Sequence, residues 1–177
     1  MTEIVIKELI SPASDVSFLN DIVALHEKSQ QENSTPYLYS QDVSFFERNL
    51  TGECLNSIAL VDNTVIGYAA LRRMDPWPSY LTPVNLPINK CGLMLINLVD
   101  PKWRGKGVGR KLCESRLSIA EQHGINHLFS TVHPENTASM QSLIKLGFTV
   151  LEEREMFEQK LRRCVLYLDL TSENKLV

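Results

Sequence analysis

The amino-acid sequence predicts an α/β protein with a single domain over residues 1–177 and a mixed, largely antiparallel central sheet flanked by helices. Stretches that alternate apolar and polar residues lie between stretches with helical spacing along the whole chain. Two apolar runs on either side of Asp62-Asn63-Thr64 indicate an antiparallel hairpin. The strongly apolar run Leu93–Val99 has the composition of a central strand that is covered on both faces.

The N-terminal part is predicted to supply three strands and two helices. Apolar residues between positions 16 and 26 follow the helical period, whereas the polar segment around Pro36 is typical of a loop. The predicted elements are a strand over Thr2–Leu9, a turn over Ser11–Ser14, a helix over Asp15–Ser29, a loop over Gln30–Ser40, a helix over Gln41–Leu50, and strands over Ser57–Val61 and Val65–Arg73.

The middle of the chain contains a segment that is expected to be irregular. Met74–Lys90 holds half of the 8 prolines, and proline removes backbone donors that helices and strands need. Further on, Gly147 is expected to stop a helix, with Phe148 as the apolar residue that accompanies such a cap. The predicted elements are a strand over Leu93–Val99, a helix over Val108–His123, a strand over Asn126–Val132, a helix over Asn136–Leu146, and strands over Thr149–Glu155 and Arg163–Leu170.

The composition argues against several classes of protein. The formal net charge is -3, with acidic residues in excess over residues 1–100 and basic residues in excess beyond them, so a nucleic-acid partner is not expected. No apolar run approaches the roughly 20 residues that cross a membrane. Met1–Lys7 is charged and alternating, unlike a signal peptide. We therefore expect a cytoplasmic protein with neither a membrane nor a nucleic-acid partner.

The cysteines and histidines do not indicate a metal site. The 4 cysteines form no CxxC pair, and no histidine is placed to complete a zinc site with them. His123 and His127 are four residues apart, but Gly124 interrupts the helix that would bring them together. We expect reduced, mostly buried thiols and no metal.

The segment that carries a chemical signal follows the predicted central strand. Residues 100–110 are Asp-Pro-Lys-Trp-Arg-Gly-Lys-Gly-Val-Gly-Arg, with glycines and several cations at the start of a predicted helix. Glycine permits sharp turns and close approach, and the N–H groups and dipole of a helix N-terminus favour anions. This order of strand, glycine-rich turn and helix predicts a phosphate-binding site. The spacing differs from that of a P-loop and of a dinucleotide-binding fold; the alternative is a surface turn with solvated lysines.

This segment closely resembles motif A of the Gcn5-related N-acetyltransferase (GNAT) family, which is [Q/R]-x-x-G-x-[G/A] preceded by V-x-P and an aromatic-Arg-Gly. Val99-Asp100-Pro101 and Trp103-Arg104-Gly105 match the preceding part. The pattern itself begins at Arg104 or, with lysine in its first position, at Lys102. A second block, in which Asn136 is followed by Lys145-Leu146-Gly147-Phe148, resembles the asparagine and GF block of the same family. The order of the elements is also similar over nearly the whole chain.

The resemblance implies an acyl-CoA N-acyltransferase fold with acetyl-CoA as co-substrate. It implies that backbone N–H groups near Arg104–Arg110 hold the pyrophosphate of coenzyme A, and that backbone groups of the preceding strand pair with the pantetheine arm. Asn136 is implied to contact the cofactor, although an asparagine there is also suited to cap a helix. The residues implied to bind the cofactor are Leu98, Val99, Arg104, Gly105, Lys106, Gly107, Val108, Gly109, Arg110 and Asn136.

The resemblance leaves the acid and the base open. The family often carries a tyrosine seven residues after the motif asparagine, which protonates the departing thiolate, and that position is Leu143 here. Ser139 and Ser142 are nearby hydroxyls that are candidates for the same role, and water is the alternative. His133 ends a predicted strand and is a candidate base, because histidine titrates near neutrality; the alternative is a solvated histidine at a loop edge.

The implied activity is transfer of an acetyl group to a primary amine by direct attack in a ternary complex. The acidic N-terminal half, which includes Glu47, favours a cationic acceptor such as a small-molecule amine or a peptide N-terminus. Trp77 and Tyr80 are expected to wall the acceptor pocket or to pack over the end of the sheet. The alternatives are a non-catalytic acyl-CoA sensor and an acyltransferase with another acyl donor. An exposed strand of the final hairpin would allow a homodimer.

Overall fold

A computed structural model describes residues 3–32, 37 and 39–172 and consists of two compact units. The first comprises Met1–Arg72 and Leu95–Ile119, and the second comprises Arg73–Met94 and Ala120–Val177. The single domain expected over residues 1–177 stays a prediction. Thr2 of the predicted first strand and Pro36 of the predicted loop lie outside the described residues.

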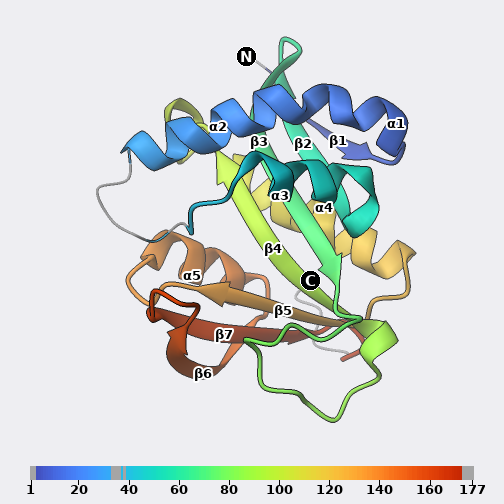
Figure 1. Cartoon of the computed structure of the whole chain (residues 1–177), viewed down its shortest axis with the longest axis vertical. Coiled ribbons are helices and arrows are strands. Elements are labelled where there is room, and N and C mark those ends of the chain that lie inside the picture. The colour runs from blue at the N-terminus through green and yellow to red at the C-terminus, as the bar shows by residue number, and fades with distance from the viewer. Residues whose placement is uncertain (1–2, 33–36, 38, 173–177) are drawn as a thin grey trace. The chain divides into compact units, whose positions relative to one another are not determined.

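The strands follow one another in a sheet whose pairings are mostly antiparallel. They are β1 (Val5–Leu9), β2 (Cys54–Val61), β3 (Thr64–Arg73), β4 (Cys91–Val99), β5 (His127–Val132), β6 (Thr149–Met156) and β7 (Leu161–Asp169). Their hydrogen-bonded order is β1-β2-β3-β4-β5-β7-β6 (Figure 1). The β4–β5 pair is parallel, whereas β1–β2, β2–β3, β5–β7 and β6–β7 are antiparallel. The predicted fold class, a mixed α/β fold with a largely antiparallel sheet and flanking helices, is confirmed.

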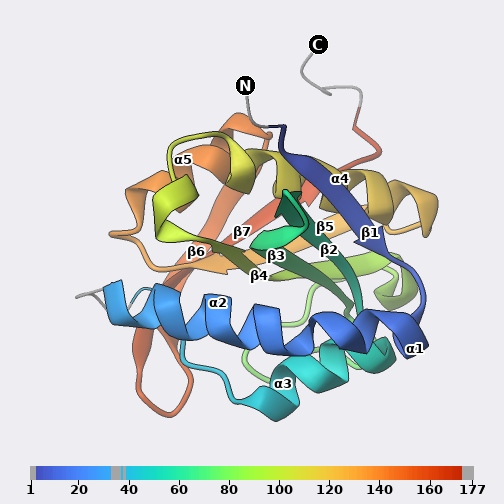
Figure 2. The same ribbon diagram turned by 90° about the horizontal axis from the view of Figure 1, so that it is seen from above.

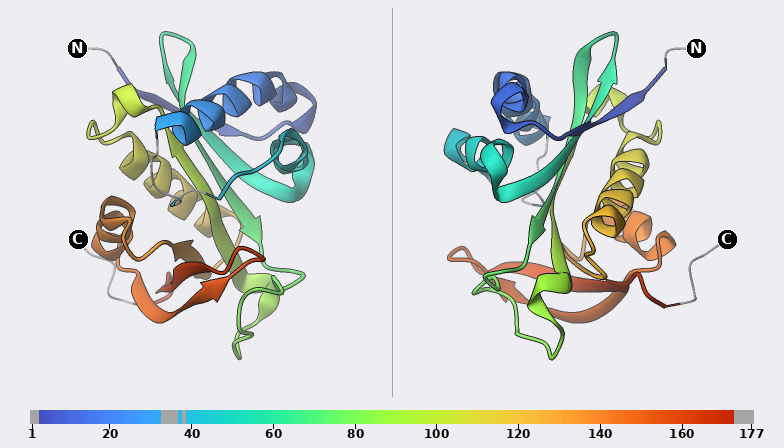
Figure 3. Two further views of the ribbon diagram at one scale, coloured as in Figure 1. Left: turned by 60° about the vertical axis from the view of Figure 1, so that its left-hand side comes forward. Right: turned by 90° about the vertical axis from the view of Figure 1, so that its right-hand side faces the viewer.

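In its described residues, the first unit contains β1, β2, nearly all of β3, the end of β4, and four helices, the last of which continues into the second unit. The helices are α1 (Pro12–Asp15), α2 (Leu19–Glu32), α3 (Val43–Arg48) and α4 (Val108–Gln122), with short helical turns over Val16–Phe18, Asn49–Glu53 and Pro101–Trp103. Figure 2 and Figure 3 show α2 and α3 on one face of the strands of this unit and α4 on the opposite face.

Each face of this sheet has its own core. Ile22 of α2 and Phe46 of α3 are buried with Leu98 of β4 in one hydrophobic cluster. Val108 and Leu112 of α4 are buried in another cluster, against which Val99, Trp103 and strand residues of β2 and β3 pack. Since consecutive side chains of a strand point to opposite faces, Leu98 belongs to the α2 face and Val99 to the α4 face.

Several boundaries in this unit differ from the prediction, and two of them have a clear physical cause. Ser11–Ser14 was expected to be a turn, but a helix begins at Pro12, because proline suits the first helical position and Asp15 accepts the Ser11 N–H at 2.7 Å. Strand β2 begins at Cys54, three residues before the predicted start at Ser57, because the residues from Cys54 to Asn56 pair with β3. Local pattern does not reveal this pairing, which depends on a distant strand.

The second unit contains the start of β4, all of β5, β6 and β7, and helix α5 (Thr137–Lys145). Cys91–Met94 pairs in parallel with His127–Ser130. The segment before β4, Met74–Lys90, contains no helix or strand except a 3-10 turn at Ile88–Lys90. The expectation that this segment is irregular is therefore confirmed. Figure 3 shows α5 next to the strands of this unit.

Helix α5 ends at the glycine that the sequence indicates. The Gly147 N–H donates to the Ile144 carbonyl at 2.9 Å, and the Phe148 N–H donates to the Leu143 carbonyl at 3.1 Å. With φ of +96° at Gly147, this is the Schellman arrangement. Leu143 and Phe148 are both buried, which is the pair of apolar positions that accompanies such a cap. The predicted glycine stop is therefore confirmed.

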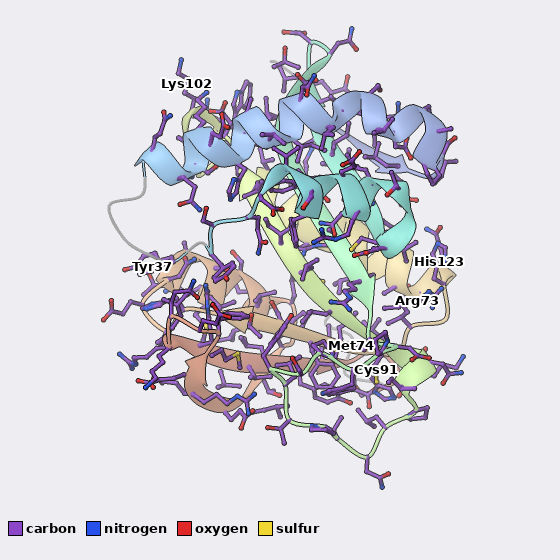
Figure 4. The ribbon with its side chains drawn as sticks, in the orientation of Figure 1. Tyr37, Arg73, Met74, Cys91, Lys102 and His123 are labelled. Atoms are coloured by element: carbon purple, nitrogen blue, oxygen red, sulfur yellow. The ribbon has the colours of Figure 1, made fainter. Side chains whose placement is uncertain are left out.

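The far end of α4 is tied to the end of β3. Arg73 and His123 lie side by side (Figure 4), with the Arg73 Nη2 atom 3.5 Å from both the Nδ1 atom and the carbonyl oxygen of His123. Next to this pair, the Met74 N–H donates to the Cys91 carbonyl at 3.1 Å. The arginine therefore binds the carbonyl of the residue that follows α4, next to the C-terminal end of the helix, where a positive charge is favourable.

Candidate functional site

The N-terminus of α4 presents a set of backbone donors in the first unit. Lys111 is the first helix residue whose N–H bonds backwards, to the Gly107 carbonyl at 3.0 Å. The N–H groups of Val108, Gly109 and Arg110 therefore precede the bonding pattern of the helix and point out from its end. Val108 is only 1% exposed, which fixes the start of the helix in the core. This arrangement suits an anion, because the donors and the helix dipole act together.

Two glycines give the turn before α4 its shape. Gly105 has φ of +74° and Gly107 has φ of +81°, and both values lie in the left-handed region that favours glycine. A Cβ atom added at either position would meet nothing within 4 Å. Glycine is thus required by the backbone conformation and not by crowding. Since no neighbouring atom crowds these glycines, a ligand can approach their backbone closely.

The cations of this segment differ in how strongly they are engaged. The Lys106 Nζ atom lies 4.5 Å from the centre of the Trp103 ring, a cation–π contact. The Arg110 Nε atom is 2.7 Å from the Glu114 carboxylate, so the charge of Arg110 is partly compensated. Lys102 and Arg104 are exposed, and Figure 4 shows Lys102 at the periphery of the molecule. Exposed cations here add to the attraction for a phosphate ligand.

Asp100 holds the turn that leads from β4 to this segment. Its N–H donates to the Ile66 carbonyl at 2.9 Å, and its carboxylate accepts the Lys102 N–H at 2.9 Å and the Lys28 ammonium at 2.5 Å. Burial raises the pKa of the Asp100 carboxyl, but the bonds from Lys28 and the Lys102 N–H outweigh it, and the net effect is a lowered pKa. The bridge ties α2 to the beginning of residues 100–107, which we call the anion-binding turn after the ligand proposed for it.

Along β4, the backbone N–H and carbonyl groups of one residue face β3, and those of the next residue face the opposite edge of the strand. The Asp100 N–H bonds to β3, and the Leu98 carbonyl lies 3.2 Å from the position of a Cβ atom built on Gly67, so both groups face β3. The N–H and the carbonyl of Val99 therefore face away from β3, since the C=O and N–H of one trans peptide point in opposite directions. The period of two gives Asn97 the same orientation. Of the two residues implied to pair with the pantetheine arm, Val99 presents its backbone groups to the edge away from β3, whereas Leu98 presents its carbonyl toward β3. Their pairing with a cofactor stays a prediction.

In the second unit, Asn136 is the N-cap of α5. Its side-chain oxygen accepts the Ser139 N–H at 3.3 Å, and its carbonyl accepts the Met140 N–H at 3.0 Å. The alternative stated for this residue, helix capping, is what the structure describes. Its contact with a cofactor stays a prediction.

The three candidates for acid or base chemistry differ in the bonds they make. The Ser142 hydroxyl donates its proton to the Ala138 carbonyl at 2.9 Å, so this proton is already engaged in a hydrogen bond within α5. The Ser139 hydroxyl belongs to a half-buried side chain in the first turn of α5. The His133 Nδ1 atom accepts the Glu135 N–H at 3.2 Å, so the neutral ring carries its proton on Nε2. Leu143 is 4% exposed and packs beneath the helix end.

A buried polar network in the first unit contains the one tyrosine of β3. The Tyr68 hydroxyl donates to the Asn56 Oδ1 atom at 2.8 Å and accepts from the Asn49 Nδ2 atom at 3.3 Å. Burial raises the pKa of Tyr68, and it raises the pKa of the adjacent Cys54 to about 12. Both groups therefore stay protonated near neutrality. Because Tyr68 is 0% exposed, it does not replace the tyrosine that position 143 lacks.

The residues predicted to wall the acceptor pocket make packing contacts in the second unit. The Trp77 Nε1 atom donates to the Leu81 carbonyl at 2.9 Å, and its ring centre lies 5.4 Å from that of Phe129 on β5. The Tyr80 ring lies 5.0 Å from that of Phe157, in the turn between β6 and β7. Packing over the sheet is thus observed, and an acceptor role stays a prediction.

Glu47 is the remaining residue predicted to bind the acceptor, and it lies in the first unit on α3. Its side chain is exposed, and its carbonyl accepts the Thr51 hydroxyl at 2.9 Å. The structure describes no bond that assigns a role to its carboxylate. It belongs to the same unit as the anion-binding turn, but α3 and α4 cover opposite faces of the strands (Figure 2).

Sequence reasoning missed Arg116 and Asn97. Arg116 stands on α4 among the buried residues Leu112 and Ala120, and a cation inside an apolar stripe of helical period is a signal that could have indicated it. Asn97 interrupts the apolar run of β4, and its side-chain amide lies 3.4 Å from the Gly109 carbonyl. Asn97 thus contacts a residue of the candidate cofactor site, and Arg116 donates to the carbonyl of Ile96, the residue before Asn97.

Neither a metal-binding cluster nor a membrane-spanning helix occurs among the described residues. They contain no group of three or more histidine, cysteine or acidic side chains that could hold a metal ion. His127, one of the histidines considered above, has its Nδ1 atom 2.9 Å from the Tyr167 hydroxyl. Among the helices that the structure describes, none combines the length and the apolar composition that crossing a membrane requires.

Comparisons with known proteins agree with this geometry. No curated protein sequence matches the chain. The N-acetyltransferase of Staphylococcus aureus Mu50 is similar in structure, with a TM-score of 0.73 and 20% identity over 96% of this chain and 100% of that chain. The ribosomal-protein-S18-alanine N-acetyltransferase of Escherichia coli has a TM-score of 0.70 and 16% identity, over 99% of each chain. The PaiA N-acetyltransferase of Thermoplasma acidophilum, in complex with coenzyme A, has a TM-score of 0.69 and 16% identity, over 94% of this chain and 99% of that chain.

A family model covers most of the chain, including the end of β4, the anion-binding turn and α5. It describes the acetyltransferase (GNAT) family and matches residues 19–148. The structural likenesses, at these low identities, support the fold alone. On the match of the family model, the chain belongs to the GNAT acetyltransferase family.

Proposed function

We propose that this chain is an acetyl-CoA-dependent N-acetyltransferase that acts on a primary amine by direct attack in a ternary complex. The observation that carries the proposal is the N-terminus of α4, where a left-handed glycine turn and three backbone donors adjoin exposed cations. The donors from Val108 to Arg110 suit a pyrophosphate, and Lys102 and Arg104 add positive charge. The PaiA relative was solved with coenzyme A, which supports the same ligand here.

The residues of the site then have distinct tasks. Gly105 and Gly107 shape the turn that receives the pyrophosphate, and the far edge of β4 at Asn97 and Val99 offers backbone groups to the pantetheine arm. Bound acetyl-CoA supplies an acetyl group that is activated as a thioester. The main contribution of the protein is to hold that group next to the amine, since two bound reactants behave as if at high concentration.

The proton transfers are proposed to involve a serine of α5 and His133, which follows the last residue of β5. We favour Ser139 over Ser142 as the donor to the departing thiolate, because Ser142 already donates its proton to Ala138. His133 is proposed as the base that keeps the amine neutral, with its Nδ1 atom held by the Glu135 N–H.

The acceptor is proposed to be a small-molecule amine or a peptide N-terminus. The E. coli relative is named for an alanine of a ribosomal protein, which supports the second class. Trp77, Tyr80 and Glu47 are proposed to contact this acceptor. The aromatic pair of Tyr80 and Phe157 supplies an apolar surface, and Glu47 supplies a negative charge for a cationic amine.

The oligomeric state and the location are also proposed. Val150 and Leu151 of β6 are 47% and 51% exposed, and β6 is an edge strand in the sheet order, so we propose a homodimer through this edge. Its test is the molar mass in solution of the parent and of Leu151→Lys, which would be monomeric. A cytoplasmic location is supported by 4 cysteines without disulfide bonds.

One observation favours a second candidate function, a non-catalytic acyl-CoA sensor. Leu143 is buried at the position of the expected tyrosine, so the protein lacks the usual proton donor there. The two functions differ in turnover. The purified protein is incubated with acetyl-CoA and a panel of amines and N-terminal peptides, and free thiol is followed; binding without amine-dependent thiol release would favour the sensor. The same assay with longer acyl-CoA donors tests the remaining hypothesis, an acyltransferase that uses a different acyl donor.

A further inference from the structure

Arg116 is a buried cation that the functions described so far do not use. It lies on α4 and is 2% exposed. In the described part of the chain it has no carboxylate partner, and its Nε atom has no hydrogen-bond partner. Taking an unpaired charge out of water costs several kcal/mol. A neutral side chain of similar length, such as methionine, would fill this space without that cost, so the guanidinium calls for a reason other than stability.

The bonds of Arg116 converge on the backbone of β4. Its Nη1 atom donates to the Ile96 carbonyl at 3.1 Å and lies 3.5 Å from the Ala70 carbonyl of β3. The Asp100 N–H bond to Ile66 sets the register of this end of the β3–β4 pair, and the same register places Ile96 opposite Ala70. Both carbonyls then point into the gap between the strands, and the guanidinium lies behind that gap on the α4 side.

The peptide group between Ile96 and Asn97 is held from both sides. Since its carbonyl points toward β3, the Asn97 N–H points to the opposite edge, as the Val99 N–H does. The Asn97 side chain is fixed to α4 as well, with its Nδ2 atom 3.4 Å from the Gly109 carbonyl and 3.4 Å from the Cys113 Sγ atom. The Cys113 Sγ atom in turn accepts a hydrogen bond from the Arg116 Nη2 group at 3.2 Å.

A charged donor on a carbonyl changes the N–H at the other end of the same peptide. Hydrogen bonds with an ionised partner are about twice as strong as neutral ones, and hydrogen-bonded groups in a low-dielectric interior polarise one another. The bond from Arg116 draws electron density toward the Ile96 oxygen. The Asn97 N–H consequently becomes a stronger donor on the edge of β4 that is proposed to face the acyl arm.

We propose that Arg116 is a positioning residue, which orients and polarises the Ile96–Asn97 peptide so that the Asn97 N–H donates to the thioester carbonyl oxygen of acetyl-CoA. This inference rests on the proposed function. It explains why Arg116 is buried without a carboxylate partner. It also gives the chain a donor that stabilises the negative charge developing on the thioester oxygen and that does not depend on the tyrosine absent at position 143.

The test replaces Arg116 by methionine, which keeps the length and removes the charge, and by lysine, which keeps the charge. In the free protein, the amide 15N and 1H resonances of Asn97 are compared; Arg116→Met is expected to move them toward a weaker donor, and Arg116→Lys to move them less. With acetyl-CoA labelled by 13C at the acetyl carbonyl, the infrared frequency of the thioester carbonyl stretch in the bound state is expected to be lower in the parent than in Arg116→Met. The kcat of Arg116→Met is expected to fall about tenfold, while its Kd for coenzyme A, which has no acyl carbonyl, stays within about twofold.

Ile119→Ala is the matched control, because Ile119 is buried on the same helix and its truncation destabilises the core without a change of charge. It is expected to leave the carbonyl stretch and the Asn97 resonances unchanged. If Arg116→Met does not fold, the comparison of the parent with Arg116→Lys carries the test, and identical spectra and kcat would overturn the inference. If the parent is active and Arg116→Met has the same Asn97 resonances, carbonyl stretch and kcat, this inference alone is overturned. A parent that binds no acetyl-CoA overturns the proposed function and this inference together.

Discussion

The same substitution, glycine to alanine, is expected to have opposite effects at two positions two residues apart. Gly107 has φ of +81°, where an L residue costs roughly 1–2 kcal/mol. Alanine recovers about 0.5 kcal/mol of this by restricting the unfolded chain, so Gly107→Ala should lower the free energy of unfolding by about 1 kcal/mol. The added Cβ meets nothing within 4 Å, which excludes a steric cause.

Gly109 lies inside α4, and a Cβ atom there would sit 3.6 Å from the Val99 Cγ2 atom and 3.9 Å from the Asn97 Nδ2 atom, which are ordinary contacts. Alanine has the higher helix propensity, so Gly109→Ala should raise the free energy of unfolding by about 0.5 kcal/mol. Gly107→Asn is the rescue variant, because asparagine tolerates the left-handed region better than other side chains do.

Urea unfolding of the three variants measures these differences, and calorimetric titration with coenzyme A measures the site. We expect the Kd of Gly107→Ala to rise about tenfold, equivalent to about 1.4 kcal/mol, because the turn relaxes and the donors of α4 lose their alignment. Gly107→Asn should recover part of this loss. Equal stability and equal Kd in the parent and in Gly107→Ala would refute the argument that the left-handed glycine shapes the anion site.

Three further predictions concern titration and proton transfer. Asp100→Asn should lower the free energy of unfolding at pH 7, because the charged bond to Lys28 is lost. In urea unfolding, the difference between this variant and the parent should vanish as the pH falls below 3.8 and through the lowered pKa of Asp100, where the parent carboxylate becomes neutral as well. A difference that does not depend on pH would contradict this. Burial lowers the pKa of His26, so the parent should lose stability as the pH falls below 6.5, and thermal unfolding of His26→Gln should lack that slope if the reasoning is correct. Ser139→Ala should reduce kcat about tenfold or more, whereas Ser142→Ala should stay within about twofold of the parent in the thiol assay; the reverse order would exchange the roles of the two serines.

The sequence is sufficient for the elements whose signals are local. The period of α4, the hairpin of β2 and β3 around Asp62–Thr64, and the glycine stop at Gly147 are all written in short windows of the chain. The same holds for the anion-binding turn, because glycine spacing and helix start are sequence features. These parts of the prediction are confirmed as structure, while the ligand itself remains proposed.

The features that the sequence did not reveal depend on distant partners. Cys54 enters β2 because β3 pairs with it, and Leu98 turns its carbonyl toward β3 because of the register of the two strands. Trp77 and Phe129 meet through the fold of the second unit, more than fifty positions apart in the chain. Arg116 lies within an apolar stripe of helical period, but the carbonyls that it contacts follow only from the packing of α4 over the β3–β4 pair. Register and packing of this kind are set by tertiary structure.

The central claim, that this GNAT protein transfers an acetyl group from acetyl-CoA to an amine, is tested most directly by one measurement. The purified protein is mixed with acetyl-CoA and a panel of polyamines, aminoglycosides and N-terminal peptides, free thiol is recorded against time, and the amine product is examined by mass spectrometry. We predict thiol release that requires an amine, equal in amount to an acetylated product, and weakened in Gly107→Ala. Tight binding of acetyl-CoA with no thiol release for any amine would contradict the claim.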